Sequence, residues 1–311
     1  MSESNSTTEN FAITDIPFYT NLRSTFNNSI YTFSSIESMD LFKKPRNKLN
    51  ELSSIQRLDN FQYIGIPLFQ CQLKKDSSSW FKRDSSNVII YKYIILPSDE
   101  NDTKRKYLMT EYLENKEYEL VCKNEEHKIS IYKVVYSEIK DETSLFSFSA
   151  SIKYTISFRD DSVSMAFDNN NVYVEVENLL LQNAKWIYKD KVDDKIGEDF
   201  VIDENYKLML QDESIVSEFD NIERSDKWTD DKLDEYMGFL KIAENNKPSS
   251  FSSNEKGQYH DNNFLNDFNE KIICMTFALI AHKKYKDDNE MTAKRRKQMC
   301  LRLLSGDVVT Y

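Results

Sequence analysis

Alternating hydrophobic and polar residues mark a series of β-strands along most of the chain. The clearest run is LFSFSASIKYTISFRDD, residues 145–161, in which Ser, Lys and Thr separate seven apolar positions. Those positions are Phe146, Phe148, Ala150, Ile152, Tyr154, Ile156 and Phe158. A period of two places all seven on one face of a strand. The pattern therefore predicts a strand with one apolar face and one polar face.

Similar runs precede and follow this strand. We predict further strands within residues 29–34, 61–73, 87–97, 105–113, 118–123, 127–139, 171–180, 184–190 and 206–211. The run 87–97 ends at Pro97, and SVSMAFD, which continues from the run 145–161, ends at the turn-like DNNN at 168–171. The order of the runs predicts an antiparallel meander with one apolar face. A short helix is predicted over 230–244, where Leu233, Tyr236, Met237 and Leu240 have helical spacing.

The run KIICMTFALIA, residues 271–281, breaks this pattern. From Ile272 to Ala281 only Thr276 is polar. The run is shorter than the roughly 18 apolar residues of a membrane-spanning helix. A helix that is apolar on every side must be enclosed on every side. We therefore expect a buried helix over residues 264–285, followed by a second helix that ends near residue 304.

A curled sheet can enclose such a helix, because each predicted strand offers one apolar face. Closing the sheet also removes its exposed edges. The expected fold is α+β and mainly antiparallel β, a closed or nearly closed β-barrel of roughly ten to twelve strands around the near-C-terminal helix. The alternative is a sandwich with the helix packed across one open end.

The composition divides the chain into regions within one domain. Residues 1–15 are rich in Ser, Thr and Asn and are expected to form a disordered tail. Residues 16–311 are expected to form a single barrel domain. Within it we predict an acidic loop region at 190–245, a linker at 246–262 and C-terminal helices at 263–304.

The net charge of −11, from 41 basic and 52 acidic residues, is unevenly distributed. Residues 190–245 hold 18 acidic and 7 basic residues, a net charge of −11 in that window alone. The chain as a whole lacks the basic footprint that nucleic-acid binding requires, so we expect no nucleic-acid partner. The acidic window is interpreted as solvated loops or as a docking surface for a basic partner.

Few residues suggest catalysis or metal binding. The three histidines, His127, His260 and His282, lack metal-ligand spacing, and Gly-rich phosphate loops are absent. The four cysteines form no C-x-x-C pair and are expected to be reduced thiols. We therefore expect no catalytic residues, no cofactor and no metal. The first residues do not resemble a signal peptide, which predicts a cytoplasmic protein, with a membrane-peripheral or nuclear location as alternatives.

Two basic groups are the candidate binding residues. The first is the cluster Lys294, Arg295, Arg296 and Lys297, and the second is Lys82 and Arg83 after Trp80 and Phe81. The cluster could be a solvated helix face, a contact for phosphoinositide or another anionic lipid, or a nuclear localisation signal.

Three segments of the chain carry a resemblance to a known family: SIKYTISF, AKWIYKD and NEKIICMTFALIAHKKYK. Together they resemble the Tubby C-terminal-like barrel superfamily. This superfamily includes Tubby-like proteins, phospholipid scramblases, plant LURP-one-related proteins and fungal members. The resemblance implies a non-enzymatic binding or adaptor protein that contacts an anionic lipid head group. A protein–protein scaffold and an enzyme with a rim active site are the alternatives. The Pro-rich tail and cysteine cluster of scramblases are missing, so family roles do not transfer residue by residue.

Overall fold

A computed structural model describes most of the predicted barrel region. The described residues are 16–21, 29–44, 55–58, 63–73, 88–142, 152–168, 171–176, 181–189, 195–196, 200–223, 234–243 and 267–283.

The described chain is built mainly from β-strands. The strands of its first half are β1 (Ile16–Asn21), β2 (Ser29–Thr32), β3 (Gln56–Arg57), β4 (Tyr63–Ile64), β5 (Phe69–Leu73), β6 (Val88–Pro97), β7 (Tyr118–Asn124) and β8 (Ile129–Asp141). Those of its second half are β9 (Ile152–Ser157), β10 (Ser162–Asp168), β11 (Asn171–Val176), β12 (Lys185–Lys189), β13 (Lys195–Ile196), β14 (Phe200–Met209), β15 (Ile215–Glu223) and β16 (Asp234–Ile242). The helices are α1 (Ile36–Lys43), α2 (Thr103–Tyr112) and a central helix at residues 267–283.

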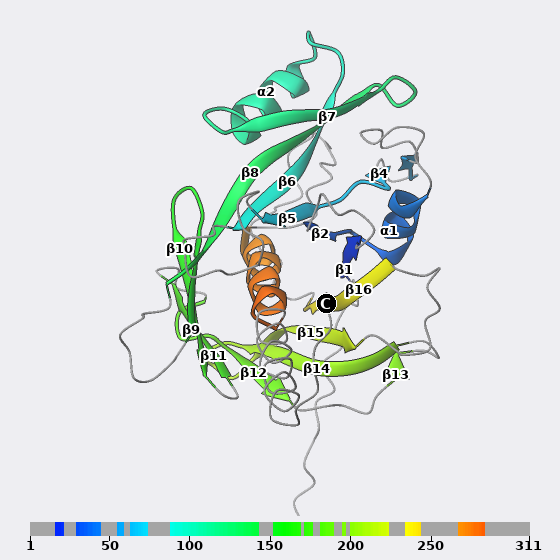
Figure 1. Ribbon diagram of the computed structural model, residues 1–311. Coiled ribbons are helices and arrows are strands. Elements are labelled where there is room, and N and C mark those ends of the chain that lie inside the picture. Colours follow the sequence, from blue (N-terminus) through cyan, green and yellow to red (C-terminus); the bar gives the residue numbers. More distant parts are fainter. Residues whose placement is uncertain are drawn as a thin grey trace, which may run out of the picture.

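The strands close into an antiparallel barrel (Figure 1). Their order is β12-β11-β10-β9-β8-β6-β5-β2-β1-β16-β15-β14, and pairing of β12 with β14 completes the ring. The closed barrel therefore has 12 strands, which confirms the predicted fold class. β1 pairs with β16, so the beginning and the end of the strand series meet in the sheet.

The central helix runs through the barrel, as the orange ribbon in Figure 1 shows. Every residue from Ile272 to Ala281 is at most 2% exposed. Its one polar member, Thr276, is satisfied within the helix, since its hydroxyl donates to the Ile272 carbonyl at 2.9 Å. The run 271–281 is therefore an enclosed helix, as its composition predicts.

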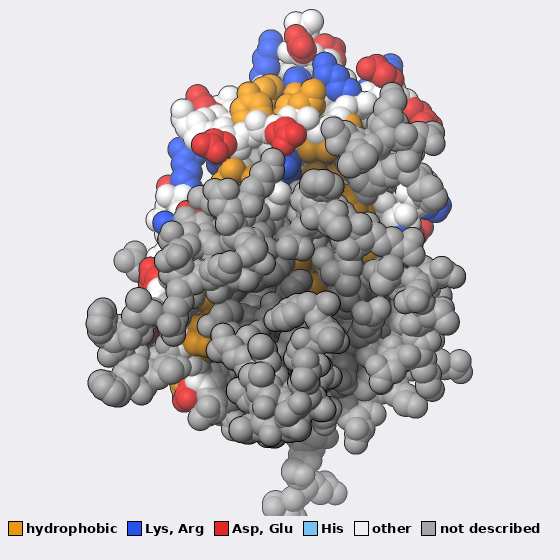
Figure 2. Space-filling view, in the orientation of Figure 1, with side chains coloured by type: hydrophobic (Ala, Val, Ile, Leu, Met, Phe, Trp, Pro, Cys, Tyr) orange, Lys and Arg blue, Asp and Glu red, His pale blue; other side chains and the backbone are white. Residues whose placement is uncertain are grey.

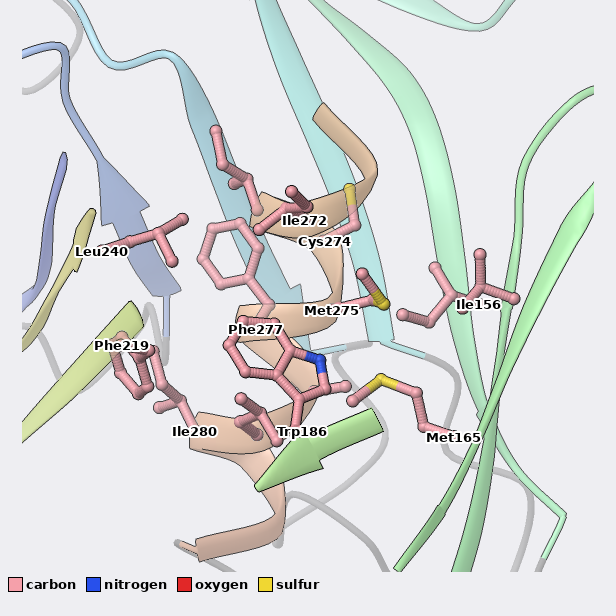
Figure 3. Close-up of a cluster of buried hydrophobic side chains, with 14 of the residues drawn as sticks. Ile156, Met165, Trp186, Phe219, Leu240, Ile272, Cys274, Met275, Phe277 and Ile280 are labelled. Carbon is pink, nitrogen blue, oxygen red and sulfur yellow. The ribbon is translucent and has the colours of Figure 1, made fainter. Parts of the chain in front are cut away.

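Side chains from strands on all sides fill the space around this helix (Figure 3). Ile156, Met165, Trp186, Phe219 and Leu240 all belong to the same buried cluster as the helix. Burying one large apolar side chain contributes about 1.5–3 kcal/mol. The barrel is consequently a packed core rather than an open channel.

The period of two predicted for residues 145–161 holds over the described part of that run. Tyr154 and Ile156 are buried in the core, and Ile152 and Phe158 pack against it. Residues 143–151, with Phe146, Phe148 and Ala150, lie outside the described residues. Strands β10 and β11 flank the predicted turn position, because Asp168 of β10 pairs with Asn171 of β11.

Two predicted elements are wrong in type. Residues 105–113 were expected to form a strand, yet Thr103–Tyr112 is helix α2. Asp102 caps this helix, as its carboxylate accepts from the amides of Lys104 and Arg105. An Asp cap favours a helix that begins at this boundary. The strand was predicted instead because the apolar residues of the run were given more weight than the cap.

The second wrong element is the helix predicted over 230–244, where the structure has strand β16. β16 pairs with β1 on one side and β15 on the other, so sheet pairing overrides the helical spacing of its apolar residues. The region 190–245 is also more than acidic loops, because it contains β13 to β16.

One end of the molecule extends beyond the barrel. β6 and β8 continue past the ring, where β7 pairs with β8 and α2 packs across them (Figure 1). A second buried cluster holds α2 there, formed by Ile94, Leu96, Leu108, Leu113, Tyr132 and Val134.

Candidate functional site

A layer of charged side chains separates the barrel core from the α2 cluster. On β6 the buried positions alternate from Val88 to Leu96, and Lys92 is the single charged residue among them. Val88 and Ile90 belong to the barrel core, whereas Ile94 and Leu96 belong to the α2 cluster. We call Lys92, Tyr136, Glu270 and Lys271 the polar layer.

Lys92 and Glu270 form a buried ion pair within this layer. The Lys92 Nζ lies 2.5 Å from a Glu270 carboxylate oxygen, and the two side chains are 9% and 7% exposed. The ammonium also lies over the rings of Tyr112 and Tyr136, at 5.3 and 5.6 Å from their centroids. These contacts replace the water that would otherwise surround the ammonium.

Tyr136 is the neutral member of the polar layer. Burial, followed by the negative charge of Glu270, raises the pKa of the Tyr136 phenol far above its usual value. The hydroxyl therefore stays protonated and forms a hydrogen bond with Glu270. In this arrangement Glu270 interacts with both an ammonium and a phenol.

Lys271 follows Glu270 in the central helix and forms ion pairs with a different set of residues. Its ammonium lies 2.6 Å from Asp161 and 2.8 Å from Asp267, and 5.7 Å from the centroid of the Phe158 ring. Burial alone would lower the pKa of Lys271. The hydrogen bonds to Asp161 and Asp267 outweigh it, and the pKa lies above its usual value.

Lys116 lies near this layer but differs from it. Burial lowers the pKa of Lys116, and the nearby positive charges of Lys92 and Arg159 lower it further. No salt bridge of the Lys116 ammonium is found within the described part of the chain. Lys116 is therefore a half-buried lysine beside the polar layer.

The other end of the central helix carries His282 and Lys283. The His282 ring stacks on Phe167 with centroids 4.0 Å apart, and Tyr154 lies 3.5 Å from its Nδ1. The Lys283 ammonium lies 3.8 Å from the Glu204 carboxylate on β14. A cation at a helix C-terminus interacts favourably with the helix dipole, and Lys283 occupies such a position.

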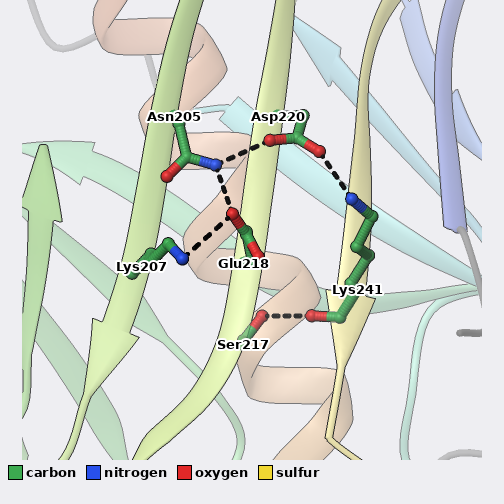
Figure 4. A network of polar contacts seen from close by, with 6 residues as sticks. All are labelled: Asn205, Lys207, Ser217, Glu218, Asp220 and Lys241. Atoms are coloured by element: carbon green, nitrogen blue, oxygen red, sulfur yellow. Dashed lines mark hydrogen bonds and ion pairs between the residues drawn. The ribbon is translucent and has the colours of Figure 1, made fainter. Parts of the chain in front are cut away.

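A third polar group links β14, β15 and β16 (Figure 4). The Asn205 amide donates to Glu218 and to Asp220, both at 2.6 Å, and Asp220 accepts from Lys241 at 2.9 Å. Lys207 pairs with Glu218 at 3.4 Å. Asn205 and Asp220 alternate with the core residues of their strands, so they lie on the side turned away from the central helix. The network joins three strands. Each of its two carboxylates, Glu218 and Asp220, is paired with a lysine of the same network.

The thiols are poorly suited to chemistry. Burial raises the pKa of Cys71, as it does for Cys274, whose sulfur accepts from the Ser137 hydroxyl at 3.6 Å. A thiol that stays protonated is a weak nucleophile. Cys71, Cys122 and Cys274 are all free of disulfides.

The histidines do not converge in the described part of the chain. His127 follows β7, with its Nε2 3.2 Å from the Ile55 carbonyl and its ring against Tyr63. His282 packs instead on Phe167 in the barrel core, and His260 lies outside the described residues. Among the residues described, no group of three or more His, Cys, Asp or Glu side chains could hold a metal ion.

The predicted binding residues cannot be placed. Lys82, Arg83 and the cluster at 294–297 all lie outside the described residues. Sequence reasoning missed the polar layer, although one signal for it exists. Lys92 is the charged residue in the apolar run NVIIYKYIILP, at a position where the period of two predicts an inward side chain.

Comparison with known proteins identifies the family. No curated protein and no solved structure matches the chain. No helix among the described residues has the length and apolarity needed to cross a membrane. The model of the DIA1 family matches residues 21–287, well over half of the chain. The chain is therefore a member of the DIA1 family.

Proposed function

We propose that this protein is a non-enzymatic binding or adaptor protein that acts through the outer surface of a filled barrel. The observation that carries the proposal is the burial of residues 272–281, each at most 2% exposed. Large barrels that bind ligands inside keep a lumen, whereas here the protein's own helix occupies the interior. Binding then falls to the rim and the outer face.

The proposed ligand is an anionic lipid head group such as a phosphoinositide. Support comes from the resemblance to the Tubby-like superfamily, whose Tubby proteins bind phosphoinositides through basic residues on the barrel. A closed antiparallel barrel around a near-C-terminal helix is consistent with that resemblance. The proposed contacts are Lys294, Arg295, Arg296 and Lys297, with Lys82 and Arg83 as a second group, in a protein that works in the cytoplasm.

Vesicle co-sedimentation tests this proposal. The wild-type protein should bind vesicles that contain phosphatidylserine and a phosphoinositide, and should not bind neutral phosphatidylcholine vesicles. Each basic residue near an anionic surface contributes about 1 kcal/mol. Replacing Lys294, Arg295, Arg296 and Lys297 with Ala should therefore weaken binding at least tenfold.

A matched control removes the same number of positive charges elsewhere. Lys44, Lys106, Lys123 and Lys140 are all exposed, and their replacement with Ala should leave vesicle binding nearly unchanged. Equal losses in both variants would point to net charge alone and contradict a specific site. Failure of the wild-type protein to bind any anionic vesicle would remove the lipid proposal.

A further inference from the structure

Strand β7 has an open edge. It pairs with β8 on one side, and no other described strand pairs with its second side. The residues from Glu117 to Leu120 are all exposed, so this edge is accessible at its beginning. An unpaired strand edge can hydrogen-bond to another extended chain.

The backbone register shows which residues offer their polar groups outward. The Val135 amide donates to the Glu117 carbonyl at 2.9 Å, so Glu117 directs its backbone toward β8. In an antiparallel pair this direction alternates along the strand. Tyr118 and Leu120 therefore direct their N–H and C=O groups away from β8.

The same two residues form an apolar strip beside α2. Tyr118 is 50% exposed and Leu120 is 43% exposed, and the Tyr118 ring meets Tyr132 edge-on at 5.8 Å. Figure 2 shows hydrophobic side chains gathered at this end of the molecule, with charged side chains around them. A strand added beside β7 would cover this strip.

The opposite face of β7 is acidic. Glu119 pairs with Lys133 at 3.2 Å, yet its side chain is 70% exposed. Burial raises the pKa of Tyr91, and the negative charges of Glu119 and Glu117 raise it further. Both glutamates therefore lie near the Tyr91 ring. The open edge thus alternates between apolar residues on one face and carboxylates on the other.

We propose that this edge of β7 binds an extended segment of a partner protein in which apolar residues alternate with Lys or Arg. The segment adds to the sheet as a further strand. Its apolar side chains pack on Tyr118 and Leu120, and its basic side chains meet Glu117 and Glu119. Backbone hydrogen bonds supply affinity in such strand addition, and the alternating side chains supply specificity.

A second copy of the same chain fits this edge poorly. Antiparallel self-pairing centred on Glu119 would set two copies of that carboxylate opposite each other. Centring it on Tyr118 would set Glu117 beside Glu119 twice. Like charges in direct cross-strand positions are destabilising. A bulge between Leu120 and Cys122 further limits the length of regular edge. The carboxylates of this edge therefore favour a basic partner over a second copy of the chain. This inference does not depend on the proposed lipid contact.

Fluorescence anisotropy with the labelled peptide KVKIKVK tests the inference. The peptide should bind the full-length protein, and the reordered peptide KKVIVKK, of equal composition and charge, should bind at least tenfold more weakly. Methylating alternate peptide amides that face β7 should also abolish binding. Hydrogen exchange should show new protection at the Tyr118 and Leu120 amides.

Protein variants complete the test. The double change Glu117→Lys and Glu119→Lys should weaken binding of KVKIKVK at least tenfold. The control change Glu100→Lys and Glu142→Lys alters two exposed glutamates that are not part of β7 and should have little effect. Equal binding of both peptides, equal effects of both variants, or no binding at about 1 mM peptide would overturn the proposal.

Discussion

At the scale of single residues, close packing around the central helix depends on a few special positions. The Phe18 ring on β1 meets Phe277 of the helix at 5.2 Å and Phe219 of β15 at 5.6 Å, both edge-on. Gly238 on β16 allows this approach. It has φ +156°, and a Cβ there would lie 2.5 Å from both the Phe219 ring and the Asp220 carbonyl. Glycine is therefore required at this position for steric reasons.

Replacing Gly238 with Ala should lower the free energy of unfolding by about 2–4 kcal/mol, because both the clash and the backbone conformation oppose a side chain. Urea unfolding measures this loss. The control Ser162→Ala changes an exposed strand residue and should stay within about 0.5 kcal/mol of wild type. An unfolding free energy for Gly238→Ala equal to that of the control would contradict the packing described for Phe219.

At the scale of elements, the sequence pattern succeeded where one apolar face decided the structure. The strand pairs around residues 152–176 and the enclosed helix follow from local periodicity alone. It failed at α2 and β16. There, a capping aspartate and pairing with β1 and β15 outweighed the apolar spacing. Register between distant strands is a tertiary property, so the local pattern could not have shown it.

The Lys92–Glu270 ion pair connects two of these elements, β6 and the central helix. Removing one partner leaves a buried charge, so Lys92→Met or Glu270→Met alone should cost about 3–5 kcal/mol. The double change Lys92→Met with Glu270→Met should cost much less than the sum of the two single changes. A double-mutant cycle in urea measures this coupling.

The exposed pair Lys153–Glu175 serves as the control for this cycle. Its charged groups lie 3.3 Å apart, but the side chains are 38% and 70% exposed. Its coupling should be below about 1 kcal/mol. Equal coupling in the two cycles would show that burial adds nothing to the Lys92–Glu270 pair.

At the scale of the whole molecule, closure of the sheet makes the central helix the core of the fold. Pairing of β12 with β14 completes the ring. The need to enclose residues 272–281 predicts that the sheet curls. It does not predict that β12 and β14 are the strands that close the ring. The polar layer was equally hidden, because Lys92 and Glu270 are 178 residues apart.

Burial of Cys71 and Cys274 predicts alkaline destabilisation of the whole fold. Both thiols have raised pKa values when folded, whereas unfolded thiols ionise near about 8.5. The unfolded state therefore loses protons first as the pH rises. Each thiol should cost about 2 kcal/mol of stability between about pH 8.5 and 10.

Urea unfolding across this pH range measures the effect. A variant with Cys71→Ala and Cys274→Ala should be less stable at neutral pH, because of lost packing, but should show a shallower decline above about pH 8.5. The control Cys122→Ala, at a partly exposed thiol, should retain the wild-type slope. Parallel curves for the wild-type protein and the double variant would contradict the burial of the two thiols.

Native-state hydrogen exchange at residues 272–281 tests most directly whether the barrel is filled by its own helix. These amides should exchange only through global unfolding, with a free energy and urea dependence equal to those of complete unfolding. The outward amides of Tyr118 and Leu120 on β7 should exchange far faster and serve as an internal reference. Exchange of the helix amides at low free energy and without urea dependence would mean that the helix leaves the barrel. The interior would then be open to ligands, and the account of a surface-binding protein would fail.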